Sequence, residues 1–388
     1  MTSIYNLPSG WKLKPFTECI EKSVSSNKLK IPQADFKRGG LYPIVDQSID
    51  FIAGYTNNSS KVYKDNLPVI IFGDHTRIFK FIDFPFAFGA DGTKLLLPKK
   101  EIFDPKYFYF FLTGLTIENQ GYSRHYKILK EKQIVIPPIN VQKKIVAILE
   151  KAEKLKEWRK EADKLANEFL ESTFLEMFGD PVKNPKNWSI EKIQYLISSI
   201  EAGWSANGES RSRKENEYAV LKVSAVTQGF FLPEECKVIN NDIELKKVVT
   251  PEKGDVLFSR ANTLELVGAS CLIREDYPYL LLPDKLWKIE VNKEKIYPEY
   301  LKFVLSHPTI RSEISKVSTG TSGSMYNISM SKLKLIGITV PPIEIQKNFS
   351  IIVETVEKAK EFQKQSSIEI NILFNAFMQK GFRGELIC

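Results

Sequence analysis

The side chains of this sequence that are best suited to bind another molecule lie in two pairs of polar loops. Residues 73–77 and 259–263 each follow an apolar run with strand character, and residues 122–127 and 319–327 precede the two Pro-Pro pairs of the chain. Arginine and asparagine can make paired hydrogen bonds to the edges of guanine and adenine, whereas serine, threonine and lysine suit phosphate groups. A single such loop could be a solvated turn, but the recurrence in both halves of the chain favours contact with DNA.

The predicted DNA contacts are the basic, amide and hydroxyl side chains of these loops, with two arginines of a polar insertion in the second half. A formal net charge of +8 and a pI of about 9.0 favour a polyanionic partner, although many basic proteins have none. The predicted contacts are His75, Thr76, Arg77, Arg124, Lys127, Arg211, Arg213, Ser259, Arg260, Asn262, Thr321, Ser324 and Asn327.

Patterns that would indicate covalent chemistry are missing from the sequence. Residues 92–94 (Gly-Thr-Lys) lack the partner glycine of a phosphate-binding loop, and Asn292 stands where the Asp…Glu-x-Lys set of a nuclease needs lysine. Neither Pro-Pro pair follows the Asn or Asp of an adenine methyltransferase motif, and the three histidines are dispersed. We therefore expect no enzyme activity in this chain, and no metal or cofactor bound by it.

The cysteines and the apolar segments predict the cellular compartment. Cys19, Cys236, Cys271 and Cys388 have no CxxC spacing, which favours unpaired thiols in a reducing compartment. The first residues contain no apolar signal core, and no apolar run approaches eighteen residues. We expect a cytoplasmic protein with no membrane partner.

Two long segments, residues 137–178 and 341–382, must position the loops. After its Pro-Pro each segment is rich in helix-forming residues and free of proline, and the two align at an offset of 204 residues without an insertion. Apolar residues recur in each at spacings of four and three, which predicts a narrow seam for a partner helix. A helix lying on its own globular domain is the alternative, but the equal length and register favour a helix pair.

The heptad pattern assigns particular residues to the contact between the two helices. Arg159 and Gln363 are the midpoints of the two runs, and we expect them to form a polar layer that fixes the register, with solvent exposure as the alternative. The predicted contacts of the helix pair are Ile148, Leu155, Arg159, Ala162, Ile352, Ala359, Gln363 and Ile370.

The remaining sequence predicts two globular domains of mixed α/β (α+β) character. Short strand-like runs separated by turn residues indicate β-rich sheets, and residues 104–112 and 297–305 indicate two equivalent helices opened by proline. Trp11 and Trp188 mark equivalent starts, so the chain is an internal duplication of a two-part unit. The predicted divisions are 1–136 (first globular domain), 137–180 (first helix), 181–340 (second globular domain) and 341–388 (second helix).

The duplication restricts the arrangement of the parts. The first helix leads from the first globular domain to the second, and by the same rule the second helix leaves the second domain and ends near the start of the first. Two helices that obey both conditions lie antiparallel, so we expect a pseudo-two-fold internal repeat with an antiparallel coiled coil.

These features resemble the DNA-specificity subunits of type I restriction–modification systems over essentially the whole chain. Each long segment begins Pro-Pro-Ile-x-x-Gln, and the segments end in Phe-Gly-Asp-Pro and Phe-Arg-Gly-Glu-Leu. The run IIFGDHTR…FAFGADGTK also looks like a known subtype of target recognition domain. In the family a glutamate usually precedes the glutamine, whereas Val141 and Ile345 stand there in this chain, so no role is transferred for that acid.

The resemblance implies two target recognition domains that read the two halves of a split DNA sequence, with the helix pair as a ruler for the gap. It also implies methyltransferase subunits that bring S-adenosylmethionine, and restriction or translocase subunits that use ATP and Mg²⁺. Two alternatives remain open at this point. One is the specificity portion of a fused endonuclease–methyltransferase, and the other is a protein–protein scaffold that does not bind DNA.

Overall fold

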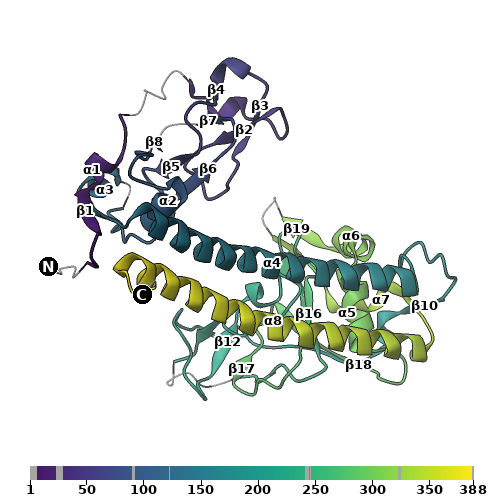
Figure 1. The fold of residues 1–388 in the computed structure, drawn as a ribbon. Coiled ribbons are helices and arrows are strands. Elements are labelled where there is room, and N and C mark those ends of the chain that lie inside the picture. Colours follow the sequence, from purple (N-terminus) through teal and green to yellow (C-terminus); the bar gives the residue numbers. More distant parts are fainter. Residues whose placement is uncertain are drawn as a thin grey trace. The chain divides into compact units, whose positions relative to one another are not determined.

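The structure is a computed structural model that describes residues 7–22, 29–89, 92–121, 123–240, 244, 246–321 and 325–386. It divides into two compact units, residues 1–161 with 364–388, and residues 162–363. Two long helices, α4 (Ile139–Phe178) and α8 (Ile343–Arg383), contribute one half each to both units (Figure 1). These bounds confirm the prediction of two long helices.

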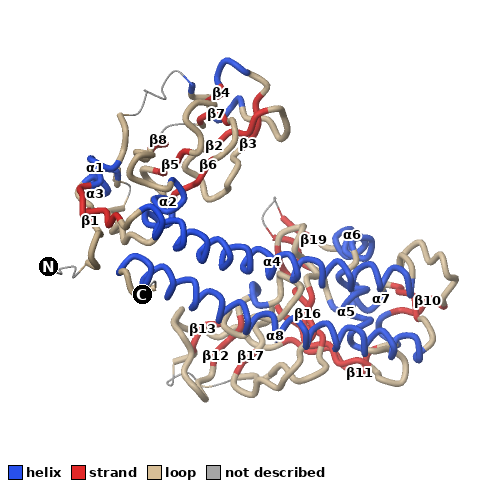
Figure 2. The backbone as a smooth tube through the Cα atoms, in the orientation of Figure 1, coloured by secondary structure: helices blue, strands red, loops and turns tan. Residues whose placement is uncertain are grey.

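Unit 1 contains a globular part built from short strands on two sheets. The buried run of β5 forms the centre of the sheet β6-β5-β8, and a second sheet has the order β3-β2-β7-β4. Figure 2 shows these strands as short segments joined by loops. The elements are β1 (Lys12–Pro15), α1 (Phe16–Cys19), η2 (Gln33–Asp35), β2 (Tyr42–Val45), β3 (Gly54–Thr56), η3 (Ser59–Lys61), β4 (Val62–Tyr63), β5 (Val69–Gly73), β6 (Phe79–Ile82), β7 (Phe86–Phe88), β8 (Thr93–Leu96), α2 (Pro105–Thr113), α3 (Tyr126–Lys130) and β9 (Gln133–Ile136).

Unit 2 is organised around the sheet β11-β18-β14-β16, with smaller sheets β13-β12-β17 and β15-β20-β19. Its elements are β10 (Ser189–Lys192), η4 (Ile193–Tyr195), β11 (Ile197–Ala202), β12 (Ala219–Leu221), η5 (Val223–Ala225), β13 (Cys236–Val238), β14 (Val256–Ser259), β15 (Ala261–Asn262), β16 (Ser270–Leu272), β17 (Leu280–Leu281), β18 (Leu286–Val291), α5 (Pro298–Ser306), α6 (Pro308–Val317), β19 (Thr319–Thr321), β20 (Met325–Asn327), α7 (Met330–Leu335) and β21 (Gly337–Val340).

The two globular parts repeat the same strand pairs in the same register. In unit 1, β1 pairs antiparallel with β9, so that Lys12 faces Ile136. In unit 2, β10 pairs with β21 in the same way, and Ser189 faces Val340. The centres also correspond, because β5 lies between β6 and β8 as β14 lies between β16 and β18. The repeat read from the sequence is thus a repeat of structure.

A glutamine fixes the start of each long helix to its globular part. The carbonyl oxygen of the Gln142 side chain accepts the backbone N–H of Asp104 at 2.9 Å, and its amide donates to the carbonyls of Ile102 and Pro137. Gln346 is equally buried and makes the same three kinds of bond, to Tyr297 N–H and to the carbonyls of Lys295 and Pro341. The glutamine shared by the two Pro-Pro-Ile-x-x-Gln segments therefore has a structural role.

Within each unit, the start of one long helix packs against the end of the other. In unit 1, Ile145 of α4 and Met378 of α8 belong to one apolar cluster. In unit 2, Phe178 near the end of α4 contacts Phe349 near the start of α8, with ring centroids 5.3 Å apart. Both contacts require opposite helix directions, which confirms the predicted antiparallel pair. The end of α8 also approaches Pro8, as the duplication argument predicts.

The buried face of α4 differs in part from the apolar seam that the heptad spacing predicts. Ile145 and Ala152 are buried, but Leu155 and Phe169, which the heptad spacing also places at the helix contact, are 42% and 52% exposed. Leu149 and Leu170 are buried instead, each one residue after an apolar position of the predicted seam. The aromatic helices α2 and α5 also pack against the long helices, so the buried face is wider than a contact between two helices. Heptad spacing predicts only the contact between two helices.

The other predicted contacts of the helix pair fall into two groups. Ile352 packs against the main core of unit 2, and Ile148, Ala162 and Ile370 are partly buried, whereas Ala359 is exposed. Arg159 belongs to unit 1 and Gln363 to unit 2. The polar layer between those two residues stays a prediction.

Some local predictions were too long. The amphipathic residues 16–24 predict a short helix. Only α1 forms within residues 16–22, because Ile20 leaves the helical conformation and forms a bridge with Pro98. Residues 23 and 24 lie outside the described residues. The strand-like run at residues 50–55 predicts a strand there, but β3 begins only at Gly54. The aromatic helix expected over residues 104–112 is α2, and Asp104 caps it by accepting the N–H groups of Lys106 and Tyr107.

Candidate nucleic-acid interface

The predicted loops of unit 1 meet at the end of β5. The backbone carbonyl of Asp74 accepts the N–H of His125 at 2.9 Å, and the Asp74 carboxylate accepts the N–H of Tyr126 at 2.7 Å. His125 is fully buried, and its Nε2 accepts the N–H of Gln120. The loop at residues 73–77 and the segment before α3, which are far apart in the sequence, therefore form one surface.

The predicted contacts on this surface differ in their freedom to move. Thr76, Arg124 and Lys127 are exposed. Arg77 is half-buried, has a left-handed φ of 64°, and donates from Nη1 to the carbonyl of Ile117 at 3.1 Å. We infer that Arg77 has a fixed orientation, whereas the other three side chains can adapt to a partner.

A third loop, at residues 46–50, was not predicted. The side chain of Gln47 accepts the N–H of His75 at 3.2 Å and lies against Gly92, where a Cβ would fall within 2.7 Å of the amide group. Lys80, which is 4% exposed, donates to the carbonyl of Asp50 and lies 3.8 Å from the Asp46 carboxylate. Burial lowers the pKa of Lys80, and the two aspartates oppose that effect. The sequence feature that could have indicated this loop is the polar stretch that follows the strand-like residues 41–45.

The corresponding loops of unit 2 meet in the small sheet β15-β20-β19. Ala261 faces Asn327 and Asn262 faces Tyr326, so the two predicted asparagines lie on neighbouring strands. The carbonyl of Arg260 accepts the N–H of Ile328 at 3.0 Å. This bond corresponds to the one from His125 to Asp74 in unit 1. Both units thus join the loop after the central strand to the segment before α3 or α7.

Two adjacent predicted contacts have different environments. Ser259 is fully buried, and its hydroxyl donates to the carbonyl of Ala261. This is a correction, because the inward side of β14 removes Ser259 from the surface. Arg260 follows on the opposite side, remains 31% exposed, and pairs with Asp284 through Nη2 at 3.1 Å.

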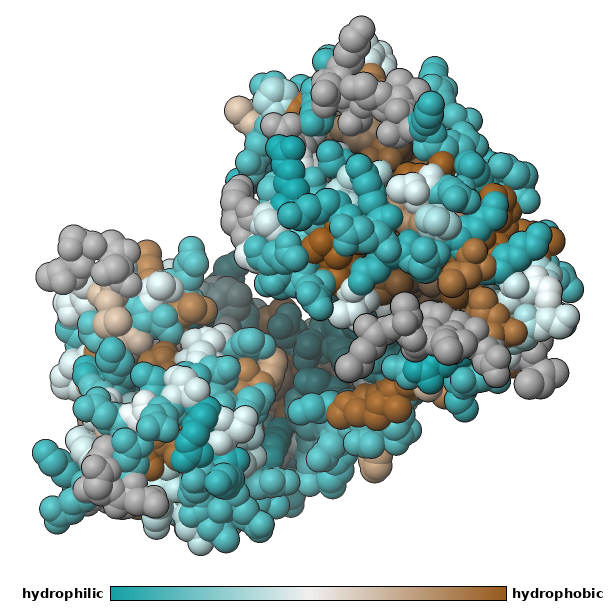
Figure 3. All heavy atoms as spheres, turned by 90° about the vertical axis from the view of Figure 1, so that its left-hand side faces the viewer, coloured by the Kyte–Doolittle hydropathy of each residue, from teal (hydrophilic) through white to brown (hydrophobic). Residues whose placement is uncertain are grey.

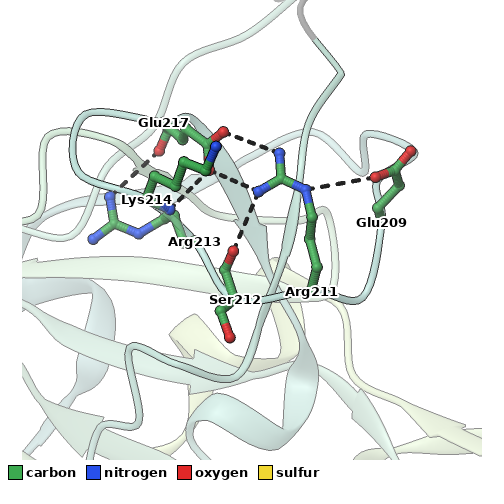
Figure 4. A network of polar contacts seen from close by, with 6 residues as sticks. All are labelled: Glu209, Arg211, Ser212, Arg213, Lys214 and Glu217. Carbon is green, nitrogen blue, oxygen red and sulfur yellow. Dashed lines mark hydrogen bonds and ion pairs between the residues drawn. The ribbon is translucent and has the colours of Figure 1, made fainter.

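The arginines of the insertion in unit 2 form a polar network around Glu217 (Figure 4). Arg211 donates to both carboxylate oxygens of Glu217, at 2.9 and 3.0 Å, and lies 3.5 Å from Glu209. Arg213 donates to the backbone carbonyl of Glu217. Hydrogen bonds from Arg211 are the main reason that the pKa of Glu217 falls to about 2. The charge of Arg211 is therefore largely compensated.

A hollow of about 630 Å³ includes part of this network and is lined by Ser210, Arg211, Ser212, Arg213, Lys222, Pro233, Glu234 and Cys236. Its mixed charge gives it no clear preference for an anion. Ser324 lies outside the described residues. Thr321 is described only as the last residue of β19.

The described residues contain no candidate metal centre, and two of their cysteines are buried. No group of three or more His, Cys, Asp or Glu side chains in them could hold a metal ion. Cys19 and Cys271 are buried, and burial raises the pKa of their thiols to about 11 and about 12, so neither is a reactive thiolate. No helix in the described ranges is both long and apolar enough to cross a bilayer.

Comparison with known families gives one match that covers most of the chain. Residues 8–164 and 185–371 match the family described as type I restriction modification DNA specificity domain. The two matched ranges follow the internal repeat.

Three curated relatives have related sequences. The chain is 28% identical over 178 residues to the type I restriction enzyme EcoEI specificity subunit of Escherichia coli, covering 46% of this chain and 30% of that protein. It is 25% identical over 366 residues to the EcoR124I/EcoR124II specificity subunit of the same organism, covering 87% and 84%. A putative MjaX specificity subunit of Methanocaldococcus jannaschii is 23% identical over 172 residues, covering 43% and 39%. Two of the three matches thus span well under half of the relative's length.

Solved structures share the fold at low sequence identity. A chain from a structure of type I R-M complex assembly and conformational transition superposes with a TM-score of 0.56 at 17% identity, covering 98% of this chain and all of that one. The S subunit of a type I restriction–modification system from M. genitalium gives a TM-score of 0.57 at 12% identity, with 98% of both chains covered.

Proposed function

Because the chain belongs to the type I restriction–modification DNA-specificity family, we propose that it recognises a split DNA sequence for a methyltransferase and restriction complex. Each globular part would read one half of the target. The helix pair would set the unspecified gap between the halves.

The main support for this proposal is that the two units share one backbone arrangement at their loops but carry different side chains there. In both units a loop after the central strand is tied by one backbone bond, at 2.9 Å to Asp74 and at 3.0 Å to Arg260, to the segment before the last short helix. The scaffold is repeated, but the surface side chains differ, with exposed Thr76 and Lys127 in unit 1 and half-buried Asn262 in unit 2. A repeated scaffold with different surface residues suits a protein that reads two different half-sequences.

Sequence selection from random duplexes tests the proposal. The full chain, assembled with type I methyltransferase subunits from the same cell, should enrich two short motifs separated by a constant gap. Affinity should fall steeply with salt because phosphate contacts release counterions. Enrichment of no sequence at low salt would contradict the DNA-reading function and favour a protein scaffold.

Partner subunits would supply the chemistry that this chain lacks. We assign S-adenosylmethionine to methyltransferase subunits, and ATP and Mg²⁺ to restriction or translocase subunits. Exposed apolar side chains on both long helices support docking there. Trp158 is 59% and Phe362 79% exposed, and the two positions are equivalent in the repeat. In the view of Figure 3, brown hydrophobic residues interrupt a mostly teal surface.

A further inference from the structure

Arg260 is held by a dedicated set of contacts in unit 2. Its Nε donates to the backbone carbonyl of Asp284 at 2.9 Å, and its Nη2 donates to the Asp284 carboxylate at 3.1 Å. Its backbone N–H donates to the carbonyl of Lys285 at 3.0 Å. Main chain and side chain of Arg260 are thus both fixed to the turn between β17 and β18.

Asp284 is itself oriented from a second direction. The hydroxyl of Ser205 donates to Asp284 Oδ1, and the Asp284 N–H donates back to the Ser205 oxygen at 3.4 Å. The segment that carries Ser205 is tied to the same turn, because Trp204 N–H donates to the carbonyl of Leu282 at 2.9 Å. Partial burial of Asp284 acts to raise its pKa, but the bonds from Ser205 and Arg260 leave the pKa below its ordinary value.

This arrangement leaves part of the guanidinium available. A guanidinium has five N–H donors. The contacts with Asp284 use Nε and one position on Nη2, so the end of the fork keeps donors on both Nη1 and Nη2. Two donors at the end of the fork are what an arginine needs to bind O6 and N7 of a guanine. The side chain is 31% exposed, and the next two residues of the chain form β15 of the small sheet.

Resting on the proposed DNA-reading function, we propose that Asp284, supported by Ser205, is a positioning residue that orients Arg260 to read one guanine in the half-sequence recognised by unit 2. A bare arginine near DNA contacts phosphates from many orientations. A carboxylate that fixes the fork restricts the arginine to one orientation and so converts an attractive charge into a base-specific contact.

The proposal predicts a loss of base discrimination when the Asp284 carboxylate is removed, which a simple charge effect does not predict. Removing the Asp284 carboxylate takes a negative charge away from the surface, which by itself strengthens binding to every duplex. If Asp284 instead orients Arg260, Asp284→Ala loses discrimination at one guanine by roughly 10- to 100-fold. Arg260→Ala should lose discrimination at that same base pair. The double variant should be no less selective there than either single variant.

The experiment is selection and competition binding with duplexes randomised at each position, using the full chain with methyltransferase subunits. Asp284→Asn, which keeps an acceptor oxygen, should retain part of the preference, and Ser205→Ala should lose a smaller part. Glu299→Gln is the matched control, because Glu299 pairs with Arg274 at 3.0 Å in the same unit. It should leave every base preference unchanged. Unchanged thermal midpoints would show that the variants are folded.

The outcomes separate this inference from the function it rests on. If the wild-type complex selects a split motif but Asp284→Ala keeps full preference at every position, the positioning role is wrong and the proposed function stands. A uniform rise in affinity for Asp284→Ala would likewise assign Arg260 to phosphate contact. If the wild-type complex selects no sequence, both ideas fail together.

Discussion

At the scale of single residues, the most informative side chains are the two glutamines that begin the long helices. A primary amide has one acceptor oxygen and two N–H donors, and Gln142 and Gln346 each bind one backbone N–H and two backbone carbonyls. Both side chains are fully buried. No other residue type offers these donors and acceptors at this length without adding charge.

We therefore expect Gln346→Ala to lower the free energy of unfolding of unit 2 substantially. The change leaves the N–H of Tyr297 and the carbonyl of Lys295 without this partner, and each buried unsatisfied group costs about 1–3 kcal/mol. A loss on the order of 3 kcal/mol should appear as a lower denaturation midpoint. Gln365→Ala, at an exposed position of α8, is the control and should change little. Equal effects of the two variants would contradict the role of Gln346.

We expect His307, which caps α6, to make the free energy of unfolding depend on pH. Its Nδ1 accepts the N–H of Thr309 at 3.4 Å. Burial lowers the pKa of His307, against the influence of Asp180 and Glu171. The imidazole of the unfolded chain therefore binds a proton more tightly than that of the folded chain. The contribution of His307 to the free energy of unfolding is present above about pH 6.5 and is lost as the pH falls through the folded pKa.

His307→Asn should reduce this loss, because asparagine can cap the helix and does not titrate. The measurement is the urea midpoint at pH 7.5 and at pH 5.5. The wild type should lose more stability than the variant over this interval. An identical loss in both proteins would remove His307 as the cause.

At the scale of elements, α4, α5 and α8 meet around one aromatic side chain in unit 2. Phe174 of α4 is 2% exposed. Its ring centroid lies 5.8 Å from that of Tyr300 and 5.7 Å from that of Phe349. The apolar face of the long helix is thus part of a globular core, and its packing stabilises the helix more than helix propensity does.

Phe174→Ala should cost about 3–5 kcal/mol, as truncations of buried phenylalanines do. Phe362→Ala, at a 79% exposed position of α8, should stay within about 0.5 kcal/mol of the wild type. If the proposed docking surface is correct, Phe362→Ala and Trp158→Ala should nevertheless weaken assembly with methyltransferase subunits. Thermal denaturation and pull-down with purified subunits measure the two effects. Normal assembly of both variants would place the partners elsewhere.

At the scale of the whole molecule, the proposed ruler makes a quantitative prediction. Inserting one heptad into each long helix, after residues 161 and 363, keeps the seam in phase and lengthens each helix by about 10 Å. At 3.4 Å per base pair, the recognised gap should grow by about three base pairs while both half-sequences stay the same. Sequence selection with the extended chain measures this. A constant gap would show that the helices do not set the spacing.

The repeat and the long helices could be predicted from the sequence because they depend on local pattern. Proline stop signals, helix-forming composition and an offset of 204 residues located α4 and α8 to within two residues. The heptad spacing did not predict that Leu149 is buried and Leu155 exposed, since both depend on the aromatic helices of the globular parts. The spacing of side chains along one helix does not specify which other helices pack against it.

The sequence by itself determined the duplication, the helix pair and the polar character of the loops, because each follows from residue type and spacing along the chain. Only the tertiary structure decided which loop residues stay at the surface. It buried Ser259, attached Arg260 to Asp284, and brought Gln47 under His75. Those contacts join residues that are 24 and 28 positions apart, and their geometry is set by how strands pack in a sheet. No local pattern specifies such pairings, since they depend on the fold as a whole.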